Sequence, residues 1–166
     1  MREYATEGLV LQREPAGEID WRVTLFTRDF GKLTAKVKSG RRITSKLAPH
    51  LEPLNVVMLR LIEKGGFQVA DALRMSRLPQ EHFSLLRFLA DTTMEGGPDH
   101  ALWTLIERHE VSPRRILFAL GLDPRSASCS RCGVPEAAWL VFSDASYRCT
   151  KCERMLPASE RRINLS

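Results

Sequence analysis

The four cysteines constrain the fold more than any other feature of the sequence. They form two C-x₂-C pairs, Cys129/Cys132 and Cys149/Cys152, separated by sixteen residues. Each pair turns the chain so that two thiolates face one point, and four thiolates complete a tetrahedral zinc shell. We therefore expect one structural zinc ion at these four residues. A pair of disulfides or of redox-active sites is the alternative, but nothing in the sequence suggests export, and disulfides are rare in the cytosol.

Residues 1–76 show the alternation of short β-strands. We expect strands at residues 4–12, 21–28, 32–38, 55–63 and 67–73, with Gly8 marking a bulge or kink. The longest connection lies between the third and fourth strands. Five short antiparallel strands in this arrangement predict a small closed barrel of the oligonucleotide-binding (OB) type, and an SH3-like barrel is the alternative.

The period changes to that of helices after Pro79. The pattern predicts a helix over residues 83–90 that is over by Gly96-Gly97-Pro98, a second over 99–110, and a third that begins after Ser112. The expected fold class is α+β. Its three parts are an OB-type five-stranded barrel at residues 1–76, a small helical domain at 77–124, and a Cys₄ zinc-ribbon-like module with a C-terminal tail at 125–166.

Positive charge gathers in the first part of the chain. The net charge is +5, and six cations with no acid lie between Asp29 and Glu52. In the third strand, apolar residues alternate with lysines, so one face is core and the other is a row of cations about 6.6–7 Å apart that can follow a phosphate backbone. The candidate nucleic-acid-binding residues are Arg22, Arg28, Lys32, Lys36, Lys38, Arg41, Arg42 and Lys46.

Two aromatic residues near these cations are candidates for base stacking. Phe26 alternates with Arg22 and Arg28 along the second expected strand, and Trp21 precedes them. Aromatic side chains among cations suit a sequence-tolerant single-strand site. The alternative is that Phe26 belongs to the core and that the lysines only keep the surface soluble.

The sequence lacks the common catalytic motifs. There is no phosphate-binding G-x-x-x-x-G-K-[ST] loop, no G-x-G-x-x-G and no G-x-S-x-G. A closed Cys₄ shell leaves no position for an activated water, so we expect a binding protein that is not an enzyme and uses no nucleotide cofactor. No apolar run approaches the length of a membrane span, and the N-terminus has no signal core, so we expect a cytoplasmic, nucleoid-associated protein without a membrane partner.

The order of these features resembles that of the bacterial RecO family. The likeness lies in residues 5–11, in 17–33 with their Gly-Glu-Ile-Asp and Val-Thr-Leu-Phe-Thr-Arg runs, in 45–54, and in the position of the cysteine pairs. It is close over residues 4–76, and the chain resembles a short member, since the helical region and the tail after Cys152 are brief.

The resemblance implies a recombination mediator of DNA repair. It implies binding of single- and double-stranded DNA, annealing of complementary strands, and partnership with RecR to load recombinase on strands coated by single-strand-binding protein. Two alternatives stay open on the residues alone. One is a zinc-ribbon/OB protein that binds RNA or acts in transcription, and the other is a protein-interaction adaptor.

Overall fold

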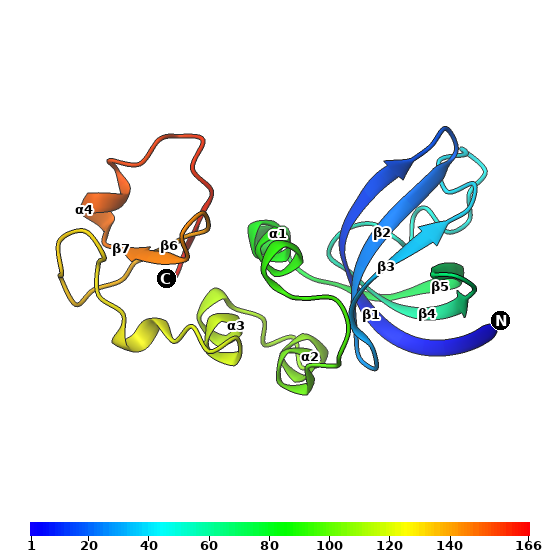
Figure 1. Cartoon of the computed structure of the whole chain (residues 1–166), viewed down its shortest axis with the longest axis horizontal. Helices are drawn as coiled ribbons and strands as arrows, with labels where there is room; N and C mark the ends of the chain where they lie inside the picture. Colours follow the sequence, from blue (N-terminus) through cyan, green and yellow to red (C-terminus); the bar gives the residue numbers. More distant parts are fainter. The chain divides into compact units, whose positions relative to one another are not determined.

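The computed structural model describes residues 1–166, which divide into two compact units, Met1–Trp103 and Thr104–Ser166. The first unit holds the five strands β1 to β5 (Figure 1). The second unit holds the four cysteines. The three-part division at residues 76 and 124 stays a prediction from sequence pattern. No helix of the structure is both long enough and apolar enough to cross a membrane.

Five strands form the barrel of the first unit. They are β1 (Arg2–Ala16), β2 (Asp20–Thr27), β3 (Gly31–Val37), β4 (Asn55–Glu63) and β5 (Phe67–Arg77). Their order around the closed barrel is β1-β2-β3-β5-β4, and β4 pairs back to β1. This order confirms the OB-type barrel, because the long connection after β3 carries the chain past the position that β5 later takes.

The barrel closes weakly between β3 and β5. These two strands run parallel and pair only at Ala35 with Phe67 and at Lys36 with Gln68. Gly31 to Thr34 therefore have no partner on β5. The segment that follows the first helix covers this part of β3 instead, and Lys32 forms an isolated parallel bridge with Glu95.

Alternation along the strands fills the barrel with aliphatic side chains. Leu33, Ala35 and Val37 of β3 are buried, while Lys32 and Lys36 point to the other face, as predicted. The interior is completed by Val10, Val23, Leu25, Leu51, Val57, Leu59, Leu61, Val69 and Ala72. Burial of this apolar surface is the main favourable term in folding, at about 25 cal/mol per Å².

The expected bulge at Gly8 lies elsewhere. Gly8 pairs regularly with Thr27 and Val57, and the register of β1 shifts between Val10 and Gln12. Gly8 is required for a different reason, since a Cβ there would lie 2.9 Å from Cδ1 of Leu59 inside the barrel. The extra residue of the bulge, Leu11, is buried like its neighbours.

The helices follow the predicted order, with α1 two residues longer than expected and α2 shorter than expected. A short 3₁₀ turn, η1 (Gln80–His82), leads into α1 (Phe83–Thr92), and α2 (His100–Glu107) and α3 (Pro113–Ala119) follow. The helix α1 lies against β1 of the barrel. It ends at Thr92, before the two glycines, because residues 93–98 leave the helical path to run beside β3. Ser112 caps α3 as predicted, accepting a hydrogen bond from the Arg115 N–H.

The second unit builds a small sheet around the cysteine pairs. After the 3₁₀ turn η2 (Pro124–Ser126), strands β6 (Trp139–Val141), β7 (Ser146–Arg148) and β8 (Arg162–Asn164) form a sheet of order β7-β6-β8, with helix α4 (Thr150–Glu153) between β7 and β8 in sequence. Together the barrel, the helices and this cysteine-bearing module confirm the α+β class.

Candidate nucleic-acid groove and metal centre

A groove of about 690 Å³ crosses the face of β2 and β3. The loop between β1 and β2 forms one wall, and the loop at Lys64 to Gly66 between β4 and β5 forms another. Arg22 of β2 and Lys36 of β3 are paired across the two strands and line the floor. This is the face, between the first and the last loops of the barrel, that OB folds use for oligonucleotides.

Lys36 is held in place by an acid. Its Nζ lies 2.8 Å from Oδ2 of Asp20, and the Lys36 side chain is still 55% exposed. The hydrogen bond from Lys36 and a second from the Ser39 N–H keep the pKa of Asp20 below its ordinary value. The ammonium group is therefore positioned at the groove while its side chain remains open to solvent.

The other predicted cations occupy several environments. Arg41 donates to the carbonyl of Gly17, a residue of the groove wall. Arg28 pairs with Glu7 at 3.1 Å, and Lys32 donates from Nζ to the Ala90 carbonyl at the end of α1. The remaining three are exposed on or after the end of β3, at Lys38, Arg42 and Lys46. The structure thus brings Arg22, Lys36 and Arg41 to the groove and directs Arg28 and Lys32 to contacts within the fold.

The two candidate stacking residues do not offer a free ring to the groove. Phe26 is only 3% exposed, so the core alternative is correct for this residue. Trp21 packs against the barrel interior, and the guanidinium groups of Arg13 and Arg41 lie 4.6 and 5.8 Å from the centre of its ring.

Sequence reasoning missed Phe67 and Lys64. Both line the groove at the β4–β5 turn. Phe67 packs against the barrel interior and the ring of Tyr4, as Trp21 packs against that interior, and it is partly exposed at the groove. The available signal was the Lys64-Gly65-Gly66 turn followed at once by an aromatic residue. In an OB barrel that turn faces the β2–β3 surface, so the topology assigns those residues to the groove once the barrel is recognised.

The four cysteines form one cluster in the second unit. Their Sγ atoms all lie within 4.8 Å of one another, and those of Cys132 and Cys149 are 3.8 Å apart. All four are free thiols in this structure. A tetrahedron with metal–sulfur bonds of about 2.3 Å has sulfur–sulfur edges of about 3.8 Å, so the cluster can hold one metal ion.

Local backbone geometry explains why the thiols converge. Gly133 follows the first pair with a φ of 75°, and its N–H donates to the Cys129 carbonyl at 2.8 Å. Cys149 is the N-cap residue of α4, and the Glu153 N–H donates to its carbonyl. Each pair is therefore closed by a tight turn of its own.

The thiols differ in their protonation. Burial raises the pKa of Cys152 to about 12, with help from the neighbouring thiols. Burial also opposes ionisation of Cys129, but N–H donors of Cys149, Cys132 and Arg131 outweigh it and lower its pKa to about 6. The pKa of Cys149 is lowered as well, mainly by a backbone hydrogen bond from Cys152, so two of the four thiols favour the thiolate form that binds a metal ion.

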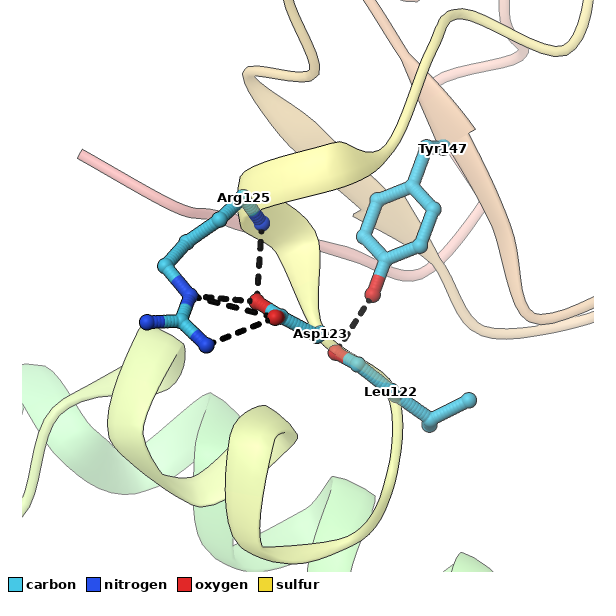
Figure 2. Close-up of polar contacts among 4 residues, drawn as sticks. All are labelled: Leu122, Asp123, Arg125 and Tyr147. Carbon is cyan, nitrogen blue, oxygen red and sulfur yellow. Dashed lines mark hydrogen bonds and ion pairs between the residues drawn. The ribbon is translucent and has the colours of Figure 1, made fainter.

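Tyr147 ties this cluster to α3 within the second unit. Its hydroxyl donates to the Leu122 carbonyl at 2.8 Å, just after α3, as Figure 2 shows. Its own carbonyl accepts from the Ser130 N–H inside the first cysteine pair. Figure 2 also shows Asp123 fixed by Arg125 through both carboxylate oxygens. Burial raises the pKa of Tyr147, so its hydroxyl stays a donor.

Comparison with known proteins gives a consistent result. Residues 1–76 match the family model described as "Recombination protein O N terminal". The chain is similar to three proteins named "DNA repair protein RecO". It is 31% identical to that of Myxococcus xanthus, over 80% of this chain and 65% of the relative, and 32% identical to that of Heliobacterium modesticaldum, over 81% and 58%. The third, from Thermodesulfovibrio yellowstonii, is 28% identical over 90% and 70%. The matches thus span less than two thirds of the length of the first two relatives.

Proposed function

From its similarity to RecO proteins, we propose that this chain belongs to the RecO family and is a DNA-binding protein of DNA repair and recombination. The observation that carries the proposal is the groove, where Arg22 and Lys36 sit side by side on the floor, with Lys64 and the Gly17 loop at the walls. A polyanion that enters this groove meets Lys36 already held in position by Asp20, so little of that side chain's entropy is lost on binding.

The physical basis of the activity is neutralisation of phosphate. Two bare DNA strands repel each other, and a basic surface that displaces their counterions can hold both while the bases pair. The same surface accepts single- and double-stranded DNA, because phosphate contacts carry no sequence information. Annealing of complementary strands follows from this property without a chemical step, and the proposal therefore includes no enzyme activity.

The partners of the proposal follow from the family. They are RecR and, through it, single-strand-binding protein on the strand that receives recombinase. We expect these proteins to bind this chain outside the groove, because a mediator must hold DNA and its protein partner at the same time.

We assign the metal of the cysteine cluster as one zinc ion with a structural role. Four thiols within 4.8 Å of one another, two of them at the 3.8 Å edge of a zinc tetrahedron, favour zinc among cytosolic metals, and a closed shell leaves no position for substrate. The ion would hold the two turns at Gly133 and α4 together in a module too small to bury a core of its own.

The test is the salt dependence of single-strand binding by the full chain. The variant Arg22→Gln/Lys36→Gln removes two charges without placing new acids beside Asp20. Each lost phosphate contact lowers the slope of log K against log salt by about 0.7, so we expect a slope reduced by about 1.4 and weaker binding at low salt.

The control is Arg87→Gln, which removes an exposed cation of α1 that does not line the groove. It should leave both affinity and slope near those of the parent. An unchanged slope in the double variant would contradict the assignment of the groove.

A further inference from the structure

A second cavity of about 550 Å³ opens beside the groove. It shares Thr34, Gly66 and Phe67 with the groove, so the two are continuous along β3. The opposite wall of this side cavity is the segment from Glu95 to Pro98, which follows α1. A nucleic-acid strand that lies in the groove would thus have this second cavity, the side cavity, next to its sugar-phosphate backbone.

The wall of the side cavity is held firmly against β3. The Gly96 N–H donates to the Lys32 carbonyl at 2.9 Å, and the Thr34 hydroxyl donates to Oε1 of Glu95 at 2.8 Å. Gly31, with a φ of 66°, packs so closely that a Cβ there would lie 1.9 Å from the Gly97 carbonyl oxygen. Three consecutive residues, Glu95, Gly96 and Gly97, each contact β3, so the position of this wall is fixed by the fold.

The side cavity is aromatic and more acidic than the groove. Phe30 and Phe67 line it with their ring centres 5.7 Å apart, and Pro98 adds a third apolar surface. Its charged residues are Asp29, Glu95 and Lys32, and the ammonium of Lys32 is bound to the Ala90 carbonyl. A phosphate group is therefore favoured in the groove, and a flat neutral group is favoured in the side cavity.

We propose that the side cavity takes one nucleobase of a single strand whose phosphates lie in the groove, and this rests on the proposed function. Phe67, at the junction, is the residue on which the base packs. The second oxygen of Glu95 accepts a hydrogen bond from an exocyclic amino group. Cytosine carries such a group and thymine does not, so the site favours cytosine over thymine.

The experiment compares oligodeoxycytidine with oligothymidine, each of about 15 nucleotides, a length within the site sizes of single OB folds. Fluorescence anisotropy at one salt concentration gives both affinities for the full chain. One hydrogen bond to the exposed Glu95 carboxylate, with the net strength of an ordinary protein hydrogen bond, predicts about two- to tenfold tighter binding of the cytidine oligomer. Glu95→Gln, which keeps the shape of the side chain, and Phe67→Leu, which removes the ring but keeps an apolar group, are the test variants.

We expect Glu95→Gln to reduce the preference to less than twofold while the salt slope stays that of the parent. Phe67→Leu should weaken binding of both oligomers about fivefold or more, again without a change of slope, since stacking involves no counterions. Glu14→Gln, an exposed acid of β1 that lines neither cavity, is the matched control and should keep the preference.

Two outcomes distinguish a failure of the proposed base site from a failure of the proposed DNA binding in the groove. Equal affinity of the parent for both oligomers, or a preference that survives Glu95→Gln, overturns the base site even where Arg22→Gln/Lys36→Gln lowers the salt slope. A slope unchanged in that double variant instead overturns the groove, and the base site with it.

Discussion

The ammonium of Lys32 donates a hydrogen bond to the Ala90 carbonyl at 2.7 Å, across 58 residues of sequence. Lys32 belongs to the alternating row of lysines on β3, yet this contact anchors the end of α1 to the barrel. Neighbouring members of one basic row therefore have different roles, and substitutions can separate them.

Lys32→Met should destabilise the protein by about 1–2 kcal/mol, because a charge-assisted hydrogen bond is lost and a partly buried carbonyl is left without its donor. Urea denaturation measures the effect. Lys38→Met, at the exposed end of the same row, should change stability by less than about 0.5 kcal/mol. A Lys32 variant of parental stability with a reduced salt slope for DNA would show that Lys32 acts as a DNA contact instead.

Asp20 should make stability depend on pH in the acid range. Its pKa in the folded protein lies below the ordinary value of 3.8, mainly through the hydrogen bond from Lys36. The folded state thus favours the carboxylate, so the stabilisation is complete above about pH 4 and disappears as pH falls through the lowered folded pKa. Asp20→Asn should lower the urea midpoint at pH 7, and its difference from the parent should shrink as pH falls through the lowered folded pKa of Asp20.

The partner variant provides the check on this pair. Lys36→Met should lose stability at pH 7 as well, and the double variant should lose less than the sum of the two single changes. Additive effects at pH 7 would mean that the ion pair at 2.8 Å contributes nothing to the fold.

Gly31→Ala should displace the wall of the side cavity. The substitution should lower the free energy of unfolding by about 1–2 kcal/mol, because alanine strains a left-handed backbone. The new Cβ would also collide with the Gly97 carbonyl, which adds to this loss. Gly17→Ala has a similar φ of 74° with no atom within 4 Å of the new Cβ, so it isolates the backbone cost alone. Hydrogen exchange of the Gly96 N–H should accelerate in the Gly31 variant and not in the Gly17 variant. Equal stability of the two variants would count against the close packing of this segment.

Cys132→Ser should reduce metal content and loosen the second unit. We expect the purified parent to carry one zinc per chain by elemental mass spectrometry, and the variant to carry much less. Loss of the ion should also release Tyr147 from the Leu122 carbonyl, which faster exchange across residues 129–154 would report. Ser130→Ala alters no thiol and should keep its zinc. A Cys132 variant with parental stability would contradict a structural role for the metal.

Sequence predicted what depends on local pattern. Alternation at Leu33, Ala35 and Val37 fixed the two faces of β3, and the spacing of the cysteines indicated the cluster that the structure forms. The sequence pattern could not identify which segments pack on each face of β3. The contact between Lys32 and Ala90, and the wall formed by Glu95 on β3, join residues about 60 positions apart, and no periodicity records such pairings.

The aromatic residues illustrate the same limit. Phe26 alternates with cations in sequence, which suggested an exposed ring, but β2 is buried on both faces from Val23 to Thr27, and the Phe26 ring is part of the packed interior of the protein. Phe67 carried no alternation signal, since its place at the groove comes from the closure of the barrel between β3 and β5. The environment of both Phe26 and Phe67 is set by residues distant in sequence that the fold brings next to them.

Hydrogen exchange of the full chain with and without single-stranded DNA tests the central claim most directly. We expect DNA to slow exchange in the loop at residues 16–20, in the β3 residues around Lys36, and at residues 64–68, which together line the groove. Exchange in the cysteine-bearing residues 129–152 should stay unchanged at the same DNA concentration. Protection confined to residues 129–152, with none at the groove, would contradict the account and assign DNA binding to the metal module.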